Sequence, residues 1–596
     1  KTDSSKTPQR IIDTELKSQD QISIFDNSLT RTLGIETSQR DKNGRIVKAA
    51  PLTNAIIVVE VLHYKILESI IKHGFKFNGY EYVLFSASAG QTRNKKVTFI
   101  RKDLFDAHKN TIFCGLNEDK INEYTDDTED ETNEDNKAHG VNLSKYFAYL
   151  SLQITSSVPW EGFDIDKAIV VDDMEMIVKN CEVDRINYNG GDWTINRTKT
   201  DVILPSVDGC GVCLSIPNNA AQIRLPWMKG LMVKFDFKAF VNEARAAEKR
   251  ENRKKGIKKS EYITNIGIVK DIYGKEYDII ADDIQYIFTK SQFKMYKYYK
   301  SWNEYKKYFK QYNCEAAICN VQKNTYFDSM MNYQQLQPLY DLNIAELKDL
   351  LSDAEHEIDN IINQKDTEKL FKLIGAVESD NNNNSNLSSY QNALLKYPQL
   401  IKDSYSQQLI KEIKKSLIEK IIGGKFHISN SRTNFIIPDL YGFAEWLFLH
   451  ENEPKGLLKN GQVSCRIIKE HTKNTPLYAD GQELNISRSP HLNFSHCINT
   501  NVINSQTEKW FNNDVLYVSN YSTNSLELMN DYDGDAALII DNPTFLNAVK
   551  RIRNQYNFVP LNYELEKGGI QKITKKNIYN SLINSYKYNK KIGDIS

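Results

Sequence analysis

Apolar residues between positions 343 and 422 recur every three or four residues, which is the spacing of one face of an α-helix. In the first part of this segment the apolar positions are Ile344, Leu347, Leu351, Ala354, Ile358 and Ile361. In the second part they are Leu409, Ile410, Ile413, Leu417, Ile418 and Ile421, followed by a glycine pair of the kind at which helices end. Asn343 and Glu346 fit a capping box at the start of the first helix. The pattern predicts a helical connector in the middle of the chain.

On both sides of this connector the pattern changes to short apolar runs separated by Gly, Asn and Pro, which is typical of strands. The predicted strands on the two sides lie at residues 202–205, 230–235, 515–518 and 536–540. A further strand pair is predicted near the beginning of the chain, at residues 81–85 and 96–100. The fold class indicated by this order is α+β, with two β-rich modules joined by helices.

The composition bounds the class of protein. The chain has 596 residues, 40% hydrophobic and 26% charged, which is enough apolar surface for several folded units. Lys plus Arg equals Asp plus Glu at 77 each, so any contact with nucleic acid must come from local clusters of basic groups. Eight cysteines without a disulfide-like spacing and no apolar run long enough for a bilayer make the cytoplasm the expected location.

The strongest chemical feature is the sequence Asp531-Tyr532-Asp533-Gly534-Asp535, between two predicted strands. In an extended strand Asp531 and Asp535 would lie roughly 13 Å apart, too far for one metal ion to bind both. The segment must therefore curl, and Gly534 permits the backbone angles that a curl requires. Three carboxylates held together repel one another unless a cation joins them, and oxygen ligands favour Mg²⁺, Mn²⁺ or Ca²⁺.

The loop has two other interpretations. An EF-hand would need glycine at its sixth position and a glutamate at its twelfth, where this sequence has Ala536 and Asn542, so that interpretation fails. An exposed acidic turn between two strands remains open on spacing alone.

The loop resembles the metal-binding signature of two-barrel RNA polymerases, in which two double-psi β-barrels face each other across the active site. That family comprises multisubunit transcription enzymes, RNA-silencing RNA-dependent RNA polymerases, and single-chain phage and prophage enzymes of the YonO-like branch. Other segments of the chain resemble family motifs in the expected order, and the matches extend from residue 81 to residue 540. These segments are residues 85–93, 208–211, 222–230, 289–294 and 488–492.

The resemblance implies a role for particular side chains. Asp531, Asp533 and Asp535 are implied to hold Mg²⁺, with Mn²⁺ as an alternative. Lys229 and Lys294 are implied to be catalytic basic residues near the phosphates. The implied substrate-binding residues are Gln222, Arg224, Arg488 and Asn530.

Some of these implied roles have ordinary alternatives. Lysine and arginine are usually solvated, and Arg488 would then form a surface ion pair. The resemblance implies that Asn530 selects the sugar of the nucleotide. Multisubunit enzymes carry a different arrangement of asparagine before the aspartates, so residues 529–530 depart from their pattern. Lys229 and Lys294 are also farther apart than the family pattern suggests, and we attribute the excess to an insertion around the basic run at residues 249–259. That run is expected to be a solvated loop.

Other features carry less chemistry. Cys210 and Cys213 have a CxxC spacing, but nothing around them fits a zinc ribbon or finger, and no zinc is expected. Aromatic residues between 298 and 312 interleave with lysines, as in nucleic-acid platforms, but they fall at helical spacing. A buried helix face with lysines outside is the favoured interpretation.

The resulting prediction is one chain with two double-psi β-barrels joined by a helical connector. The predicted units are an N-terminal accessory region at 1–190, a first barrel at 191–300, the connector at 301–428, a second barrel at 429–545 and a C-terminal helical region at 546–596. The first barrel carries the basic residues and the second the aspartate loop. The resemblance implies that the two barrels face each other across the active site.

The resemblance favours the phage or prophage branch, which implies DNA-templated RNA synthesis from NTPs with Mg²⁺ and without separate protein subunits. The implied partners are a DNA template, the RNA product and NTPs, with no membrane. RNA-templated synthesis of the silencing type is the alternative, since both share the same chemistry. A catalytically inactive nucleic-acid-binding protein with two barrels, or an unrelated protein that binds divalent ions, is kept as well. A phage or prophage protein would act in the bacterial cytoplasm or travel in the virion.

Overall fold

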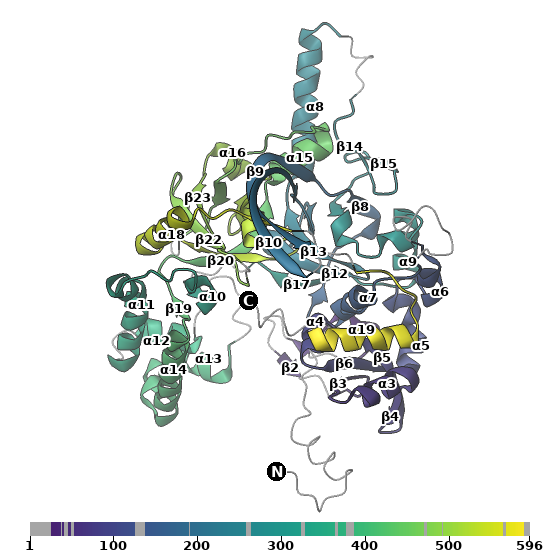
Figure 1. Cartoon of the computed structure of the whole chain (residues 1–596), viewed down its shortest axis with the longest axis horizontal. Coiled ribbons are helices and arrows are strands. Elements are labelled where there is room, and N and C mark those ends of the chain that lie inside the picture. Colours follow the sequence, from purple (N-terminus) through teal and green to yellow (C-terminus); the bar gives the residue numbers. More distant parts are fainter. Residues whose placement is uncertain are drawn as a thin grey trace, which may run out of the picture.

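A computed structural model describes most of the chain (Figure 1). The described residues are 26–36, 39–40, 46–48, 53–125, 138–189, 191–257, 264–322, 328–363, 367–376, 387–469, 472, 474–490, 493–563 and 568–588. Residues 491–492 of the predicted second-barrel motif and residues 258–259 of the basic run lie outside this set. No helix within the described ranges is long and apolar enough to cross a membrane.

The N-terminal region contains a four-stranded antiparallel sheet in the order β3-β6-β5-β4. Its strands are β3 (Ile56–Glu60), β4 (Phe75–Phe77), β5 (Tyr80–Ser86) and β6 (Lys96–Arg101). The predicted strand pair at 81–85 and 96–100 is confirmed, because β5 and β6 pair antiparallel over these residues. The other elements here are α2 (Ser28–Thr32), β1 (Gln39–Arg40), β2 (Ile46–Lys48), α3 (Tyr64–His73), α4 (Ala89–Arg93), α5 (Lys102–Ile112), α6 (Glu118–Glu123) and α7 (Leu143–Ser151).

The first barrel module is a seven-stranded mixed sheet that curls into a half-barrel and does not close. Its order is β7-β17-β12-β13-β11-β16-β8. The strands are β7 (Val158–Pro159), β8 (Ala168–Val171), β11 (Cys210–Cys213), β12 (Ala220–Leu225), β13 (Met228–Lys234), β16 (Tyr286–Thr289) and β17 (Ala317–Val321). The predicted strand at 230–235 lies largely in β13.

Two further features extend this module, a long hairpin in the middle of Figure 1 and a helix that projects at its top. One is a long curved hairpin formed by β9 (Glu175–Asn189) and β10 (Asp192–Pro205), which includes the predicted strand at 202–205. The other is α8 (Phe237–Lys254), which is followed by the short pair β14 (Ile268–Lys270) and β15 (Glu276–Asp278). Helix α8 and the pair β14 and β15 lie in the interval between Lys229 and Lys294, where an insertion is expected. The basic run is expected to be a loop, but its first part forms the C-terminal end of α8. Lysine and arginine stabilise this end of a helix through the helix dipole.

The aromatic segment after the first module forms α9 (Trp302–Gln311), whose N-cap Ser301 accepts a hydrogen bond from the amide of Glu304. Trp302, Tyr305 and Phe309 are buried on one face of this helix. The prediction of a buried aromatic face is therefore confirmed.

The predicted helical connector is confirmed by five helices at the lower left of Figure 1. These are α10 (Tyr333–Leu336), α11 (Ile344–Asn363), α12 (Thr367–Ile374), α13 (Ser389–Lys396) and α14 (Ser404–Ile422), with the strand pair β18 (Met330–Met331) and β19 (Phe426–His427) beside them. Asn343 and Glu346 form the reciprocal hydrogen bonds of the predicted capping box. The last helix, α14, ends at the predicted glycine pair, where Gly424 has a positive φ of 70°.

The second barrel module is closed, in the order β20-β24-β21-β23-β22-β25. Its strands are β20 (Arg432–Pro438), β21 (Gln462–Cys465), β22 (Glu483–Ser487), β23 (His496–Asn501), β24 (Leu516–Val518) and β25 (Ala536–Ile540). The helices α15 (Leu440–Leu449), α16 (Ser505–Trp510) and α17 (Asn524–Leu528) lie in the connections between strands. The predicted strands at 515–518 and 536–540 correspond to β24 and β25.

The last described segments return to earlier parts of the molecule. α18 (Pro543–Tyr556) packs against the second barrel, and β26 (Leu561–Asn562) pairs with β9. α19 (Lys575–Tyr588) packs Leu582, Ile583 and Tyr586 against the N-terminal sheet and α3. The prediction of an α+β chain with two barrel modules and a helical connector is confirmed, while the exact domain boundaries stay predictions.

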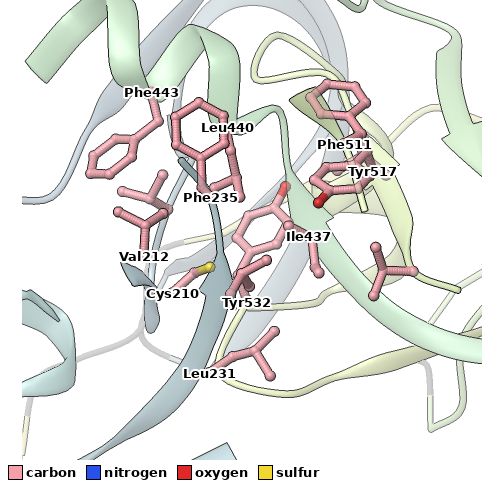
Figure 2. Packing of buried hydrophobic residues seen from close by; sticks show 14 of the residues in the cluster. Cys210, Val212, Leu231, Phe235, Ile437, Leu440, Phe443, Phe511, Tyr517 and Tyr532 are labelled. Atoms are coloured by element: carbon pink, nitrogen blue, oxygen red, sulfur yellow. The ribbon is translucent and has the colours of Figure 1, made fainter. Parts of the chain in front are cut away.

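The two barrel modules share one hydrophobic core (Figure 2). Val212 and Leu231 of the first module and Ile437 and Tyr517 of the second are all at most 1% exposed within it. Tyr532, the aromatic residue between the first two aspartates of the acidic loop, is buried in the same core. Burial of this ring ties the acidic loop to the junction of the two modules.

Candidate active site

The acidic loop connects α17 to β25 and lies at the junction of the two barrel modules. Helix α17 ends at Leu528, and its C-cap Met529 has a left-handed backbone (φ 50°) that turns the chain away from the helix axis. Gly534 has φ 122°, a conformation that side chains other than glycine rarely adopt. At the end of the loop, the carbonyl of Asp535 accepts a hydrogen bond from the amide of Ile436 and so joins strand β20.

The loop curls as predicted, and it brings three carboxylates together. Asp531, Asp533 and Asp535 each offer an oxygen, and these oxygens lie within 4.8 Å of one another. Burial first, and then the charges of Asp533 and Asp535, raise the pKa of Asp531 to about 7. Bringing the three carboxylates together in a partly buried loop therefore disfavours the ionised form of Asp531.

Two basic side chains contact this carboxylate cluster from different modules. Lys229, on β13 of the first module, forms an ion pair with Asp533. Arg488, which follows β22 of the second module, places its Nη2 at 2.7 Å from Oδ2 of Asp535. Its Nη1 also donates to the carbonyl of Met529 at 2.8 Å, so Arg488 holds both ends of the loop. Burial would raise the pKa of Asp533, but the charge and hydrogen bond of Lys229 keep that pKa below its usual value.

Lys294 is the second basic residue of the first module near the cluster. Its amide donates to the carbonyl of Trp227 at 2.9 Å, which fixes the turn after β16 close to the start of β13. Burial, and then the charge of Lys229, lower the pKa of its ammonium group, while the carboxylates of Asp208, Asp533 and Asp531 act in the opposite direction. Lys294 thus faces the same cluster as Lys229.

The two modules also meet at the acidic loop through close contacts of their main chains. The amide of Tyr532 donates to the carbonyl of Asp208 at 2.8 Å. A Cβ atom on Gly209 (φ 79°) would lie 2.4 Å from Cβ of Asp533. From the facing strand, the side-chain amide of Gln222 donates to the carbonyl of Asp533 at 3.3 Å and lies against Gly534. Both glycines are needed for this close approach.

Two of the residues predicted to bind substrate have other described contacts. Asn530 donates from its side chain to the carbonyl of Asp531 at 3.2 Å, within its own loop. Arg224 donates to the carbonyl of Ile223 and lines a small cavity with Glu315 and Thr111. Among the described residues, no hydrogen bond or ion pair joins Arg224 to the three aspartates.

A supporting network was missed by sequence reasoning. Asp173 accepts hydrogen bonds from the hydroxyl of Ser291 at 2.5 Å and from its amide at 3.0 Å. The Ser291 hydroxyl in turn accepts from the amide of Gly209 at 2.7 Å. This network fixes the turn that packs on Asp533. Its partners are 118 residues apart, and the only local signal is the acidic pair of Asp172 and Asp173 directly after a buried strand.

The donor set of the loop fits a hard divalent cation. It consists of carboxylate oxygens alone, which suits Mg²⁺ or Mn²⁺ better than a metal that prefers sulfur or nitrogen. Burial, and then the charges of Asp533 and Asp535, raise the pKa of Asp531, and a bound cation would favour the ionised form against both effects. Asp531, Asp533 and Asp535 are the residues that would hold it.

Comparison with known proteins places this geometry in context. A family model described as RNA dependent RNA polymerase matches residues 19–596. The DNA-directed RNA polymerase YonO of Bacillus phage SPbeta is 39% identical over 584 residues, which cover 98% of this chain and 61% of YonO. The solved structure of the RNA dependent RNA polymerase QDE-1 from Thielavia terrestris covers 95% of this chain with a TM-score of 0.52 at 12% identity. This chain spans 56% of that QDE-1 chain.

These matches agree with the arrangement of the modules. The likeness to QDE-1 concerns the fold, and the chain spans about three fifths of the length of YonO. The resemblance that the aspartate loop and the ordered motifs indicated is confirmed at the level of the family. Because the family model matches nearly all of the sequence, the chain belongs to the RNA dependent RNA polymerase family.

Proposed function

We propose that the chain is a nucleotidyltransferase that joins NTPs to the 3′-hydroxyl of a growing RNA on a DNA template. The observation that carries the proposal is the meeting of three carboxylates from one module with Lys229 and Lys294 from the other. Phosphoryl transfer needs negative ligands for cations and positive groups beside the phosphates, and it needs them within one site.

In this proposal Asp531, Asp533 and Asp535 hold Mg²⁺, or Mn²⁺ in its place. One bound cation would lower the pKa of the RNA 3′-hydroxyl, and a second that arrives with the NTP would offset charge on the departing pyrophosphate. Lys229 and Lys294 stabilise the negative charge that grows on the phosphate oxygens. Arg488 positions the aspartate loop through Asp535 and Met529, and in this proposal it also binds the template or the nucleotide. Gln222 fixes the carbonyl of Asp533 and so orients that carboxylate.

The choice of template rests on sequence identity. The relative at 39% identity is named a DNA-directed RNA polymerase, whereas the relative named an RNA dependent RNA polymerase is 12% identical. We therefore favour a DNA template, with RNA-templated synthesis as the second candidate, which the family name supports. The proposal includes action without a second polypeptide, because both halves of the site come from one chain, and a location in the cytoplasm of a bacterial host.

The test is incorporation of labelled NTPs by the purified chain with Mg²⁺ on matched single-stranded DNA and RNA templates. The parent chain should extend RNA on DNA, and Asp533→Ala should abolish extension while circular dichroism stays unchanged. Asp119→Ala, at an exposed aspartate in the first turn of α6, is the matched control and should retain full activity. Extension on RNA alone would assign the RNA-templated reaction.

Two results would contradict the proposal. Substantial synthesis by Asp533→Ala would remove the aspartates from the reaction. Absence of synthesis on both templates, with nucleic-acid binding retained, would favour an inactive binding protein.

A further inference from the structure

The hairpin of β9 and β10 contains the two longest strands in the described part of the chain. Both ends of the hairpin lie close in sequence to residues that hold the aspartate loop in place. Strand β9 begins two residues after Asp173, which is hydrogen-bonded to Ser291. Strand β10 ends three residues before Asp208, whose carbonyl binds the amide of Tyr532. The hairpin is therefore a direct extension of the candidate active site.

The lower half of the hairpin is held firmly against the second module. Val183, Val202 and Leu204 are buried in a small cluster that includes Leu526 of α17, the helix directly before the aspartate loop. Strand β26 pairs with β9 at Asp184 and Arg185. The tip extends four residues beyond this support, which corresponds to roughly 13 Å.

The tip has an aromatic and aliphatic face that the described residues do not cover. Tyr188 lies opposite Trp193, and Ile186 lies opposite Ile195 on the same face. Trp193 is 69% exposed, Tyr188 58% and Ile195 63%. The two rings lie 4.7 Å apart between centroids and are tilted by 40°, so their outer faces remain open to solvent.

The charges beside this face are balanced, which bears on the kind of partner. Arg197 forms a two-pronged ion pair with Asp184 directly below the isoleucine pair. Lys199 lies opposite Glu182 one step further along the same face. A polyanion would gain little from charge here, whereas an unstacked base would gain contact with an aromatic face. Stacking is sequence-tolerant, as a templated reaction requires of any group beside its strands.

We propose that the tip of the β9–β10 hairpin, whose base adjoins the candidate active site, binds single-stranded nucleic acid by stacking bases on Trp193 and Tyr188. The inference rests on the proposed function for the origin of that strand, as template or as product. A cross-strand aromatic pair also stabilises a hairpin, but hairpin stability alone does not account for the exposed outer faces of the rings and the isoleucine pair beneath them.

Fluorescence of Trp193 provides the direct test. Trp160, Trp227, Trp302 and Trp510 are buried and Trp446 is partly buried. All five are unchanged in Trp193→Phe, so the difference between the parent chain and this variant isolates the exposed indole. Titration with oligothymidylate and, separately, oligouridylate should quench this difference signal in a saturable way. Quenching by only one of the two assigns the strand as DNA or RNA. Absence of quenching by both would overturn the proposal.

Binding by variants provides the second measurement. Trp193→Ala should weaken oligonucleotide binding by about 5- to 150-fold, the range expected for one lost stacking contact. Trp193→Phe, which retains an aromatic ring, should recover most of the affinity. The fold loss should be nearly independent of salt because ion pairing contributes little. Thr194→Ala, on the opposite face of the same strand, is the matched control and should bind like the parent chain.

The outcomes separate this inference from the proposed function. Asp533→Ala should retain Trp193 quenching, since stacking needs no catalysis. If synthesis fails and quenching persists, the proposed function fails and the binding surface stands. If Trp193→Ala lowers thermal stability but binds oligonucleotides with unchanged affinity, the aromatic pair only stabilises the hairpin and this proposal is wrong.

Discussion

At the residue scale, the ion pair of Lys229 and Asp533 determines how charge is distributed in the site. The two residues are 304 positions apart and belong to different modules. The ion pair with Lys229 keeps the pKa of Asp533 low. Asp531 forms no ion pair with a described residue, and its pKa is raised to about 7. Neighbouring carboxylates of one loop therefore hold protons with very different strength.

Replacement of Lys229 should affect catalysis far more than folding. We expect Lys229→Ala to lower kcat by roughly 10²- to 10³-fold, the effect of removing one preorganised donor from an oxyanion hole. Lys234→Ala, at an exposed lysine on the same strand, is the matched control. Steady-state NTP incorporation measures both variants. An unchanged kcat for Lys229→Ala would remove this lysine from the reaction.

The raised pKa of Asp531 predicts how binding of Mg²⁺ depends on pH. Below about pH 7 Asp531 carries a proton that a cation must displace, so the affinity for Mg²⁺ should rise with pH and level off above that value. Calorimetric titration with Mg²⁺ on both sides of pH 7 measures this. Asp531→Asn should bind more weakly and lose the pH dependence. A flat profile for the parent chain would contradict the raised pKa.

At the element scale, the turn at residues 208–209 packs directly against the aspartate loop, backbone against backbone. Gly209 combines a positive φ with contact to Asp533, and the Asp173–Ser291 network holds the turn in place from behind. A side chain at this position would push the loop away from the turn. The shape of the site thus depends on the turn as much as on the aspartates.

Substitution of Gly209 should therefore abolish synthesis in addition to straining the backbone. Gly79 has nearly the same backbone angle (φ 82°) but open space around its missing Cβ. We expect Gly79→Ala to lower the free energy of unfolding by about 1–2 kcal/mol and to leave synthesis intact. Gly209→Ala should lose synthesis as well. Thermal unfolding and NTP incorporation, measured on both variants, test this, and equal behaviour of the two would contradict it.

Local patterns predicted the elements, but not the contacts between them. The ends of α11 and α14 follow from an asparagine-glutamate capping pair and a glycine pair, signals that lie within a few residues of each helix end. The curl of the aspartate loop follows from charge repulsion and Gly534. The partners of Asp173 and the direction of Arg224 depend on the pairing of distant strands, which no local pattern contains. The hairpin was predicted only at 202–205, because most of its other positions are polar and exposed.

At the scale of the whole molecule, the shared core joins the two barrel modules into one cooperative structure. Apolar residues of both modules interdigitate in a single cluster, with Tyr532 among them (Figure 2). Loss of packing on one side should therefore be transmitted to the other. The site lies at this junction, so its geometry depends on the integrity of both modules.

A cavity in the second module should consequently weaken the first. Ile437 is fully buried in the shared core, and Ile437→Ala should lower the free energy of unfolding by about 2–5 kcal/mol. Hydrogen exchange should then speed up in β13 as well as in β24. Ile203→Ala, at a residue that is 59% exposed, is the control and should change little. Faster exchange confined to the second module would argue against a shared core.

The main-chain hydrogen bond between Tyr532 and Asp208 has a consequence for how the molecule tolerates evolutionary change. A bond between two backbone groups does not depend on the side chains, so any substitution at either position, except proline at 532, leaves its donor and acceptor in place. The two halves of the site can therefore keep their mutual alignment while the surrounding side chains are exchanged to suit new substrates. Such tolerance ends at Gly209 and Gly534, the positions where adding a single carbon would move one half against the other.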